Sequence, residues 1–179
     1  MPGLVYPAML MLDLPRLERE GRLSVEADVP SDDPLWQGSD LRFEGTVFVR
    51  LDAHEAGSGE VVVRGRVKGV LLEECRRCLS PIRRPLNQEL IVVYTPVDEL
   101  ADGEYESDVR ELPYDIVELN LGDAVREELM LDVDRYVVCR PDCRGLCPVC
   151  GVNLNEDTCE CSLDEPDPRW DALRALNKE

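Results

Sequence analysis

Eight cysteines constrain this chain of 179 residues more than any other feature of its sequence. They occur in four close pairs, which are Cys75 and Cys78, Cys139 and Cys143, Cys147 and Cys150, and Cys159 and Cys161. Two cysteines separated by two residues can bind one metal ion, because the tight turn between them brings both sulfur atoms to one side. Zinc prefers four such thiolates in a tetrahedron. The spacing therefore predicts structural zinc.

A disulfide framework is the alternative for eight thiols if a chain is secreted. The N-terminal region gives no indication of secretion, because its longest apolar run, residues 4–12, follows no positive charge and is interrupted by Pro7. No stretch of the sequence approaches the roughly 20 consecutive apolar residues of a membrane helix. We therefore expect a protein of the reducing cytoplasm, without a membrane partner, in which the cysteine pairs bind metal.

The strongest single motif is Cys147-Pro-Val-Cys150-Gly151. A glycine after the second cysteine can adopt a positive φ, which aims backbone amides at the anionic sulfurs. The loop that follows is long enough for the chain to return. Cys159 and Cys161 are therefore expected to complete a first zinc site with Cys147 and Cys150.

A second zinc site is predicted from the cysteines that remain. Cys139 and Cys143 have one unused pair elsewhere, Cys75 and Cys78, so this site would join the C-terminal tail to an earlier loop. Two alternatives stay open, namely buried free thiols and a redox pair at Cys75 and Cys78. Buried thiols do not need this spacing, and nothing in the sequence places the redox motif at the start of a helix after a strand.

Alternating hydrophobicity predicts a β-sheet in the first part of the chain. The clear strands are residues 41–51, 61–72 and 86–95, and the weaker ones are 9–14, 23–29 and 116–119. The glycine-containing turn 54–59 joins the first two clear strands in a hairpin. A helix is predicted at 120–131, because Leu121, Val125 and Leu129 share one face, and a last short helix is predicted from about Pro168.

These elements predict an α+β fold. It would be an antiparallel β-sheet or a partly closed barrel with one or two helices and a cysteine-rich, zinc-binding C-terminal tail. The sheet domain would span residues 1–134 and contain an acidic loop at 96–113, which is poor in large apolar residues. The tail would span residues 135–179.

The net charge of −18 argues against a general nucleic-acid coat, because the chain would repel the phosphate backbone. Only the segment 61–95 is basic, with seven basic and three acidic residues. It contains all the candidate RNA contacts, which are Arg64, Arg66, Lys68, Arg76, Arg77, Arg83 and Arg84. Four arginines stand beside cysteines: Arg76, Arg77, Arg140 and Arg144. These four either neutralise thiolate charge or contact phosphate.

Signals of catalysis are missing from the sequence. The single histidine, His54, lies in a glycine-rich turn and is expected to be an exposed loop residue. Neither a phosphate-binding glycine loop nor a nucleophile elbow occurs, and the carboxylates lie in solvated runs. We expect a protein that is not an enzyme and has no small-molecule substrate.

Several motifs together resemble a known family. They are Gly65-x-Val67, Cys75-x-Arg77-Cys78-Leu79, Arg126-Glu-Glu-Leu129, Cys143-Arg-Gly-Leu-Cys147-Pro-x-Cys150-Gly-x-Asn153-Leu-Asn155, Cys159-x-Cys161 and Asp167-Pro-Arg169. The combination resembles the YceD family, the large ribosomal RNA subunit accumulation proteins, over roughly residues 40–177. The resemblance implies a non-catalytic bacterial factor needed for normal accumulation or processing of large-subunit ribosomal RNA.

Three functional hypotheses follow. The resemblance implies ribosomal RNA or a large-subunit assembly intermediate as the partner. The second hypothesis is an interaction protein, in which the acidic region 98–134 holds a basic ribosomal protein before assembly. The third is a thiol redox or zinc-storage protein. Salt-sensitive RNA binding through the arginines would favour the first, and capture of a basic protein through the acidic region would favour the second.

Overall fold

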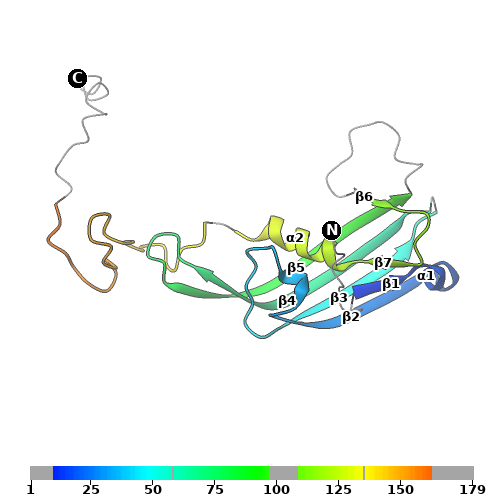
Figure 1. Cartoon of the computed structure of the whole chain (residues 1–179), viewed down its shortest axis with the longest axis horizontal. Helices are drawn as coiled ribbons and strands as arrows, with labels where there is room; N and C mark the ends of the chain where they lie inside the picture. Colours follow the sequence, from blue (N-terminus) through cyan, green and yellow to red (C-terminus); the bar gives the residue numbers. More distant parts are fainter. Residues whose placement is uncertain (1–9, 58, 97–108, 135, 163–179) are drawn as a thin grey trace, which may run out of the picture. The chain divides into compact units, whose positions relative to one another are not determined.

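The computed structural model describes residues 10–57, 59–96, 109–134 and 136–162 (Figure 1). Its elements are β1 (Met11–Asp13), α1 (Leu14–Glu20), β2 (Arg22–Pro30), the 3-10 helix η2 (Pro34–Trp36), β3 (Thr46–Glu55), β4 (Val61–Glu74), β5 (Pro81–Pro96), β6 (Val109–Leu112), β7 (Glu118–Asn120) and α2 (Gly122–Asp132). The predicted α+β fold class is confirmed.

A five-stranded sheet in the order β2-β3-β4-β5-β6 forms the main layer, and β1 pairs with β7 in a small second sheet. The strand order is open, so the architecture is the sheet and not the barrel. The antiparallel pairings of β2, β3 and β4 agree with the prediction, and β6 adds a parallel pairing to β5 at the edge of the sheet. Strand β6 arises from the end of the predicted acidic loop, whose residues 97–108 lie outside the described residues.

The central strands agree with the predicted alternation, apart from their ends. The run predicted from residue 41 enters the sheet only at Thr46, because Gly45 adopts a positive φ of 69° before it. Phe43 still forms an isolated bridge with Leu71 of β4, which explains why the apolar alternation begins earlier than the strand. The three weaker strand candidates correspond to β1, β2 and β7.

Strand β5 begins well before the predicted residue 86 and includes Pro85. Proline cannot donate a ladder hydrogen bond, so it is tolerated where a strand is an edge. Strand β6 pairs only with Val93–Pro96, which leaves one side of β5 without a partner strand at Pro85 among the described residues. The proline therefore marks an open edge and not the start of the strand.

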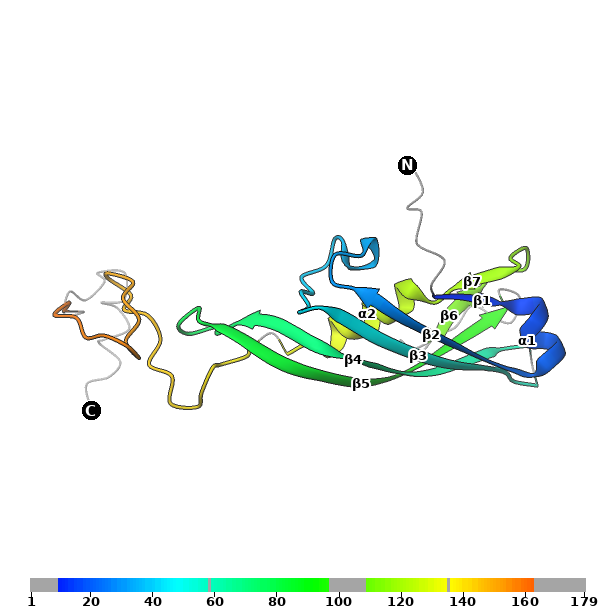
Figure 2. The same ribbon diagram turned by 90° about the horizontal axis from the view of Figure 1, so that it is seen from below.

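The core lies between the sheet and α2. Val47, Val49 and Leu51 of β3 are fully buried and face the core, as do Val125 and Leu129 of the helix. Helix α2 crosses in front of the strands in Figure 1 and behind them in Figure 2, so it covers one face of the sheet. The opposite face, turned to the viewer in Figure 2, carries no helix in the part of the chain that the structure describes.

Helix α1 was missed by the sequence analysis, although its end signals are present. The Asp13 carboxylate accepts a hydrogen bond from the backbone N–H of Arg16, at 2.8 Å, and caps the first turn. Pro15 lies in that turn, and Gly21 ends the helix in a left-handed conformation. The helix has seven residues, too few for a clear hydrophobic period.

The chain divides into two compact units. The sheet unit comprises Met1–Glu73 and Ile82–Arg135, and the cysteine unit comprises Glu74–Pro81 and Tyr136–Glu179. The sequence pattern predicts a single boundary near residue 134, whereas the connection between β4 and β5 also belongs to the second unit. The short helix predicted from about Pro168 lies outside the described residues.

Candidate metal centres and their surroundings

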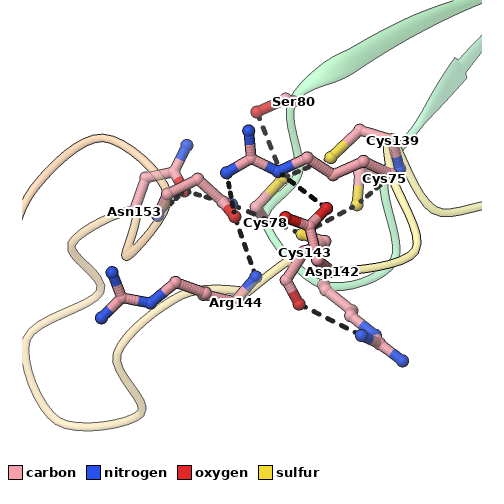
Figure 3. Close-up of polar contacts among 11 residues, drawn as sticks. Cys75, Cys78, Ser80, Cys139, Asp142, Cys143, Arg144 and Asn153 are labelled. Carbon is pink, nitrogen blue, oxygen red and sulfur yellow. Dashed lines mark hydrogen bonds and ion pairs between the residues drawn. The ribbon is translucent and has the colours of Figure 1, made fainter.

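The structure brings Cys75, Cys78, Cys139 and Cys143 together in a cluster that we call the hairpin site (Figure 3). The Sγ atoms of Cys75 and Cys143 are 3.7 Å apart, and those of Cys78 and Cys139 are 3.6 Å apart. All four sulfurs lie within 4.8 Å of one another. A tetrahedron with Zn–S bonds of about 2.3 Å has edges of about 3.8 Å, so the sulfur spacing fits four thiolates around one ion.

The tail site consists of Cys147, Cys150, Cys159 and Cys161, whose sulfurs also lie within 4.8 Å of one another. Cys147 is buried and the other three are partly or fully exposed. The backbone N–H of Cys147 donates to the carbonyl of Val152 at 2.8 Å, which closes the turn after Cys150. Both tetrads contain the cysteines that the sequence analysis grouped together.

The same backbone turn forms at both Cys-x-x-Cys motifs. The N–H of Gly151 donates to the carbonyl of Cys147, and the N–H of Leu79 donates to the carbonyl of Cys75, each at 2.8 Å. Gly151 has the predicted positive φ, 76°, and Leu79 has a φ of 58°. Leu79 is the only described residue other than glycine with a positive φ, and the sequence analysis did not identify this strain.

In each site the first cysteine of the Cys-x-x-Cys motif has a pKa well below its usual value. Burial opposes ionisation of Cys75, but the backbone N–H groups of Cys139, Cys78 and Arg77 outweigh it and lower the pKa of Cys75 to about 6. In the tail site, backbone N–H groups, chiefly that of Cys150, lower the pKa of the Cys147 thiol to about 6. The folded backbone therefore favours a thiolate at the first cysteine of each motif.

Each site also contains a thiol that resists ionisation. Burial, together with the hydrogen bond to Cys78, raises the pKa of Cys139 to about 12. The hydrogen bond to Cys150, followed by loss of water around the sulfur among its neighbouring thiols, raises the pKa of Cys161 to about 12. Four neighbouring sulfurs cannot all carry negative charge without a cation among them. Four soft donors around one centre, with no open ligand position, are the donor set of a structural zinc ion.

The arginines beside the cysteines contact oxygen atoms and an aromatic ring. Arg77 donates through its guanidinium to the carbonyl of Cys143 at 3.1 Å, and Arg140 donates to the side-chain oxygen of Asn155 at 2.9 Å. The guanidinium carbon of Arg76 lies 5.4 Å from the ring centre of Tyr136. These contacts arrange the backbone around the ligands.

Three of the candidate RNA-binding arginines form ion pairs in the sheet unit. Arg66 pairs with Glu89, Arg83 pairs with Glu44, and Arg84 pairs with Glu73. Arg64 and Lys68 have no ion-pair partner among the described residues. Both lie on β4, on the face of the sheet opposite α2.

A model of the family described as large ribosomal RNA subunit accumulation protein YceD matches residues 63–177. The chain belongs to the YceD family. The matched segment contains all eight cysteines and most of β4. The resemblance found in the sequence motifs is therefore confirmed.

Similarity to known proteins extends beyond the segment that the family model matches. An uncharacterized protein of Mycobacterium tuberculosis is 31% identical over 166 residues, which cover 92% of this chain and 79% of the relative. The large ribosomal RNA subunit accumulation protein YCED homolog 1, chloroplastic, of Arabidopsis thaliana is 28% identical over 67 residues, 37% of this chain and 21% of the relative. No solved structure matches significantly. Within the described residues, no helix is long and apolar enough to span a membrane.

Proposed function

We propose that this YceD protein is a zinc-binding, non-catalytic factor that promotes the accumulation of large-subunit ribosomal RNA in the bacterial cytoplasm. The observation that carries the proposal is the family match over a segment that contains two complete cysteine tetrads. A catalytic zinc site keeps one ligand position open for water or substrate, whereas each tetrad already supplies four protein ligands. The metal would therefore shape the protein and not perform a reaction.

The cysteines would hold one zinc ion in each site. Cys75 and Cys147 contribute ready thiolates, and the bound ion would supply the positive charge that lets the remaining thiols ionise. The hairpin site then ties the connection between β4 and β5 to residues that follow α2. Zinc binding would accordingly contribute folding free energy to the cysteine unit.

The competing function, an acidic chaperone for a basic ribosomal protein, rests on the negative charge of residues 96–134. That segment has fourteen acidic and two basic residues. Part of this charge is neutralised internally, because Arg110 pairs with Glu127 at 2.7 Å and with Glu128 at 3.6 Å. The RNA-directed function therefore has the stronger support, and capture of a basic protein is an alternative outcome of the test.

The deciding experiment measures the ratio of large-subunit to small-subunit ribosomal RNA in cells that lack the protein. We expect the ratio to fall and the full-length chain to restore it. The double variant Cys147→Ser/Cys150→Ser should fail to restore it, whereas Val149→Ser, a change at an exposed residue between the two ligands, should restore it fully. An unchanged ratio in the deleted cells would reject the ribosomal function. If the double variant restores the ratio, metal binding at the tail site is not needed for the ribosomal function.

A further inference from the structure

The face of the sheet opposite α2 forms a broad groove of about 710 Å³. Strands β3, β4 and β5 line it with side chains of both polar and apolar character. Its lining includes four basic residues, Arg50, Arg64, Arg66 and Lys68, two acidic residues, Asp52 and Glu89, and the apolar residues Phe48 and Ile91. This face is open in Figure 2 among the described residues. A ligand could therefore lie across three strands without displacing any described element.

The cations of this groove differ in how they are paired. Arg50 lies 3.2 Å from a carboxylate oxygen of Glu26, and Arg66 pairs with Glu89. No ion pair forms at Arg64 or Lys68 in the described part of the chain, and Asp52, which is opposite Arg64 in the β3–β4 register, pairs with Arg50 at 3.6 Å. Arg64 and Lys68 are four residues apart on one face of β4, or about 13 Å along the strand. The groove thus offers two separate positive points within a strongly acidic protein.

Apolar side chains are exposed between these charges. Phe48 is directly opposite Lys68 in the β3–β4 register and is 37% exposed, and Ile91 of β5 is 54% exposed. An aromatic ring on an open sheet is a platform on which a nucleic-acid base can stack. A duplex keeps its bases stacked on one another, so only an unpaired base can reach this ring.

We propose that the outer face of β3, β4 and β5 binds single-stranded RNA, with Arg64 and Lys68 contacting phosphates and Phe48 stacking under a base. This inference rests on the proposed function and specifies the state of the RNA that is recognised. It assigns phosphate contact to two of the seven basic candidates. Arg83 and Arg84 instead support the sheet through their ion pairs.

The test uses the zinc-loaded full chain and a fluorescent 12-nucleotide RNA, offered single-stranded or as a duplex, with anisotropy measured at several salt concentrations. Arg64→Gln/Lys68→Gln should weaken single-strand binding and lower the log–log salt slope by about 1.4, the value for two lost phosphate contacts. The control Arg83→Gln/Arg84→Gln removes the same charge and should leave the slope unchanged. Phe48→Ala should weaken binding about fivefold or more without altering the slope, and Phe48→Tyr should retain binding.

Three outcomes would overturn the proposal that this surface binds single-stranded RNA. They are equal losses of affinity in the two double variants, tighter binding of the duplex than of the single strand, and no binding by the unaltered chain. None of these outcomes decides the proposed function, which the ribosomal RNA ratio in cells tests separately. Arg64, Lys68 and Phe48 lie on the outer face of the sheet, whereas Arg84 lies on the face of Leu86 and Leu90. Circular dichroism and urea denaturation therefore check that every variant is folded before its binding is compared.

A different observation concerns Asn155, which lies in the loop between two ligands of the tail site. Its side-chain amide donates to the sulfur of Cys143, a ligand of the hairpin site, at 3.4 Å. Its side-chain oxygen accepts hydrogen bonds from the backbone N–H of Arg144 at 2.8 Å and from the Arg140 guanidinium at 2.9 Å. One residue of the tail-site loop is thereby attached to the hairpin site.

The backbone links the two sites at the same place. Only three residues separate Cys143 from Cys147. Within this segment, the N–H of Leu146 donates to the carbonyl of Arg77 at 3.0 Å, and the carbonyl of Gly145 accepts from Leu154 at 2.9 Å. A metal ion that orders the tail-site loop therefore also orders the groups around Cys143.

We infer that Asn155 is a positioning residue that couples the two sites, so that filling the tail site raises the metal affinity of the hairpin site. Partners that orient a metal ligand typically change metal affinity by about 10- to 100-fold. The coupling requires the donated amide hydrogen bond and not merely the presence of the loop.

Chelator competition on the full zinc-loaded chain tests this coupling, with native mass spectrometry counting ions and cysteine alkylation showing which site has lost its metal. Asn155→Asp retains the acceptor oxygen but removes the donor to Cys143, and it should weaken the hairpin site about tenfold in the fully loaded chain and remove the dependence of its affinity on the tail site. Glu156→Gln, on the same loop, is the matched control and should change neither site. An unchanged hairpin site, or a hairpin-site affinity in Asn155→Asp that still depends on whether the tail site is filled, would overturn the inference.

Discussion

Gly65 in β4 faces Leu51 of β3, and the leucine side chain fills the space that a larger residue at position 65 would need. A Cβ atom added at Gly65 would lie 2.3 Å from Cδ2 of Leu51 and 2.7 Å from the carbonyl oxygen of Arg50. The second contact is with backbone, which cannot move without disturbing the sheet. The motif Gly65-x-Val67 therefore has a packing cause, because it brings β3 and β4 close together.

We expect Gly65→Ala to lower the free energy of unfolding by about 1 to 3 kcal/mol, the usual cost of overpacking a well-packed core. Urea denaturation of the zinc-loaded chain measures it. Gly57→Ala is the control, because a Cβ atom there meets nothing within 4 Å. A stability at Gly65→Ala equal to that of the control would show that the strands separate easily at this point.

Leu79 presents the opposite case, a side chain where the backbone favours glycine. It is 58% exposed, so its packing contributes little, and its φ of 58° lies in the left-handed region. That conformation costs roughly 1 kcal/mol or more for a residue with a Cβ atom. Leu79→Gly should therefore stabilise the protein by about 1 kcal/mol. Leu79→Ala retains the Cβ atom and should therefore not stabilise the protein. If the denaturation curves of the two variants coincide, the backbone at residue 79 is not strained.

At the scale of one element, β5 shows how pairing on each side decides the environment of its residues. Near Pro85 the strand has one open edge, whereas residues 93–96 lie between β4 and β6. Tyr94 belongs to the enclosed part, and its side chain is buried in the core with residues of α2. Burial disfavours the phenolate and raises the pKa of Tyr94 to about 12, although Arg110 acts in the opposite direction.

This burial predicts a loss of stability in alkali. The folded-state pKa of Tyr94 is raised from an ordinary value of 10, so its contribution is complete below pH 10 and is lost as the pH rises through about 12. Over that range the unfolded chain releases the proton while the folded chain keeps it. The loss should be on the order of 2 to 3 kcal/mol relative to Tyr94→Phe, measured as unfolding free energy from pH 9 to 12. Parallel pH profiles for the two proteins would contradict it.

At the scale of the whole molecule, the cysteine unit is assembled from two distant parts of the sequence. Residues 74–81 contribute Cys75 and Cys78, and the segment after α2 contributes the other six cysteines. Metal binding at the hairpin site closes a loop of 60 residues between Cys78 and Cys139. An ion that binds the four assembled ligands, and not the unfolded chain, would add its binding free energy to the free energy of unfolding.

We expect the purified full chain to contain about two zinc ions. Cys75→Ser should reduce this to about one, because the tail site keeps its four ligands, and it should expose residues near Cys139 to limited proteolysis. Metal analysis and mass-mapped cleavage products measure these effects, with chelator-treated protein as the reference for loss of both ions. An unchanged cleavage pattern and zinc content would show that the two pairs do not share a metal.

The sequence alone determined the features that depend on local spacing. The alternation of apolar residues predicted the strands, because side chains of a strand alternate between its two faces. The Cys-x-x-Cys spacing predicted the metal-binding pairs, since one turn suffices to place two sulfurs together. The glycine after Cys150 predicted the left-handed turn for the same local reason.

The tertiary structure decided what depends on pairing between distant segments. It showed that β6 joins β5 in parallel, which no periodicity within either strand can indicate. It also showed which basic residues form ion pairs and which, like Arg64 and Lys68, do not. The sequence cannot show this, because the carboxylate partner of Arg83 lies 39 residues away along the chain. The tertiary structure also placed Asn155 against Cys143, a contact set by how two loops fold together and not by the spacing of either one.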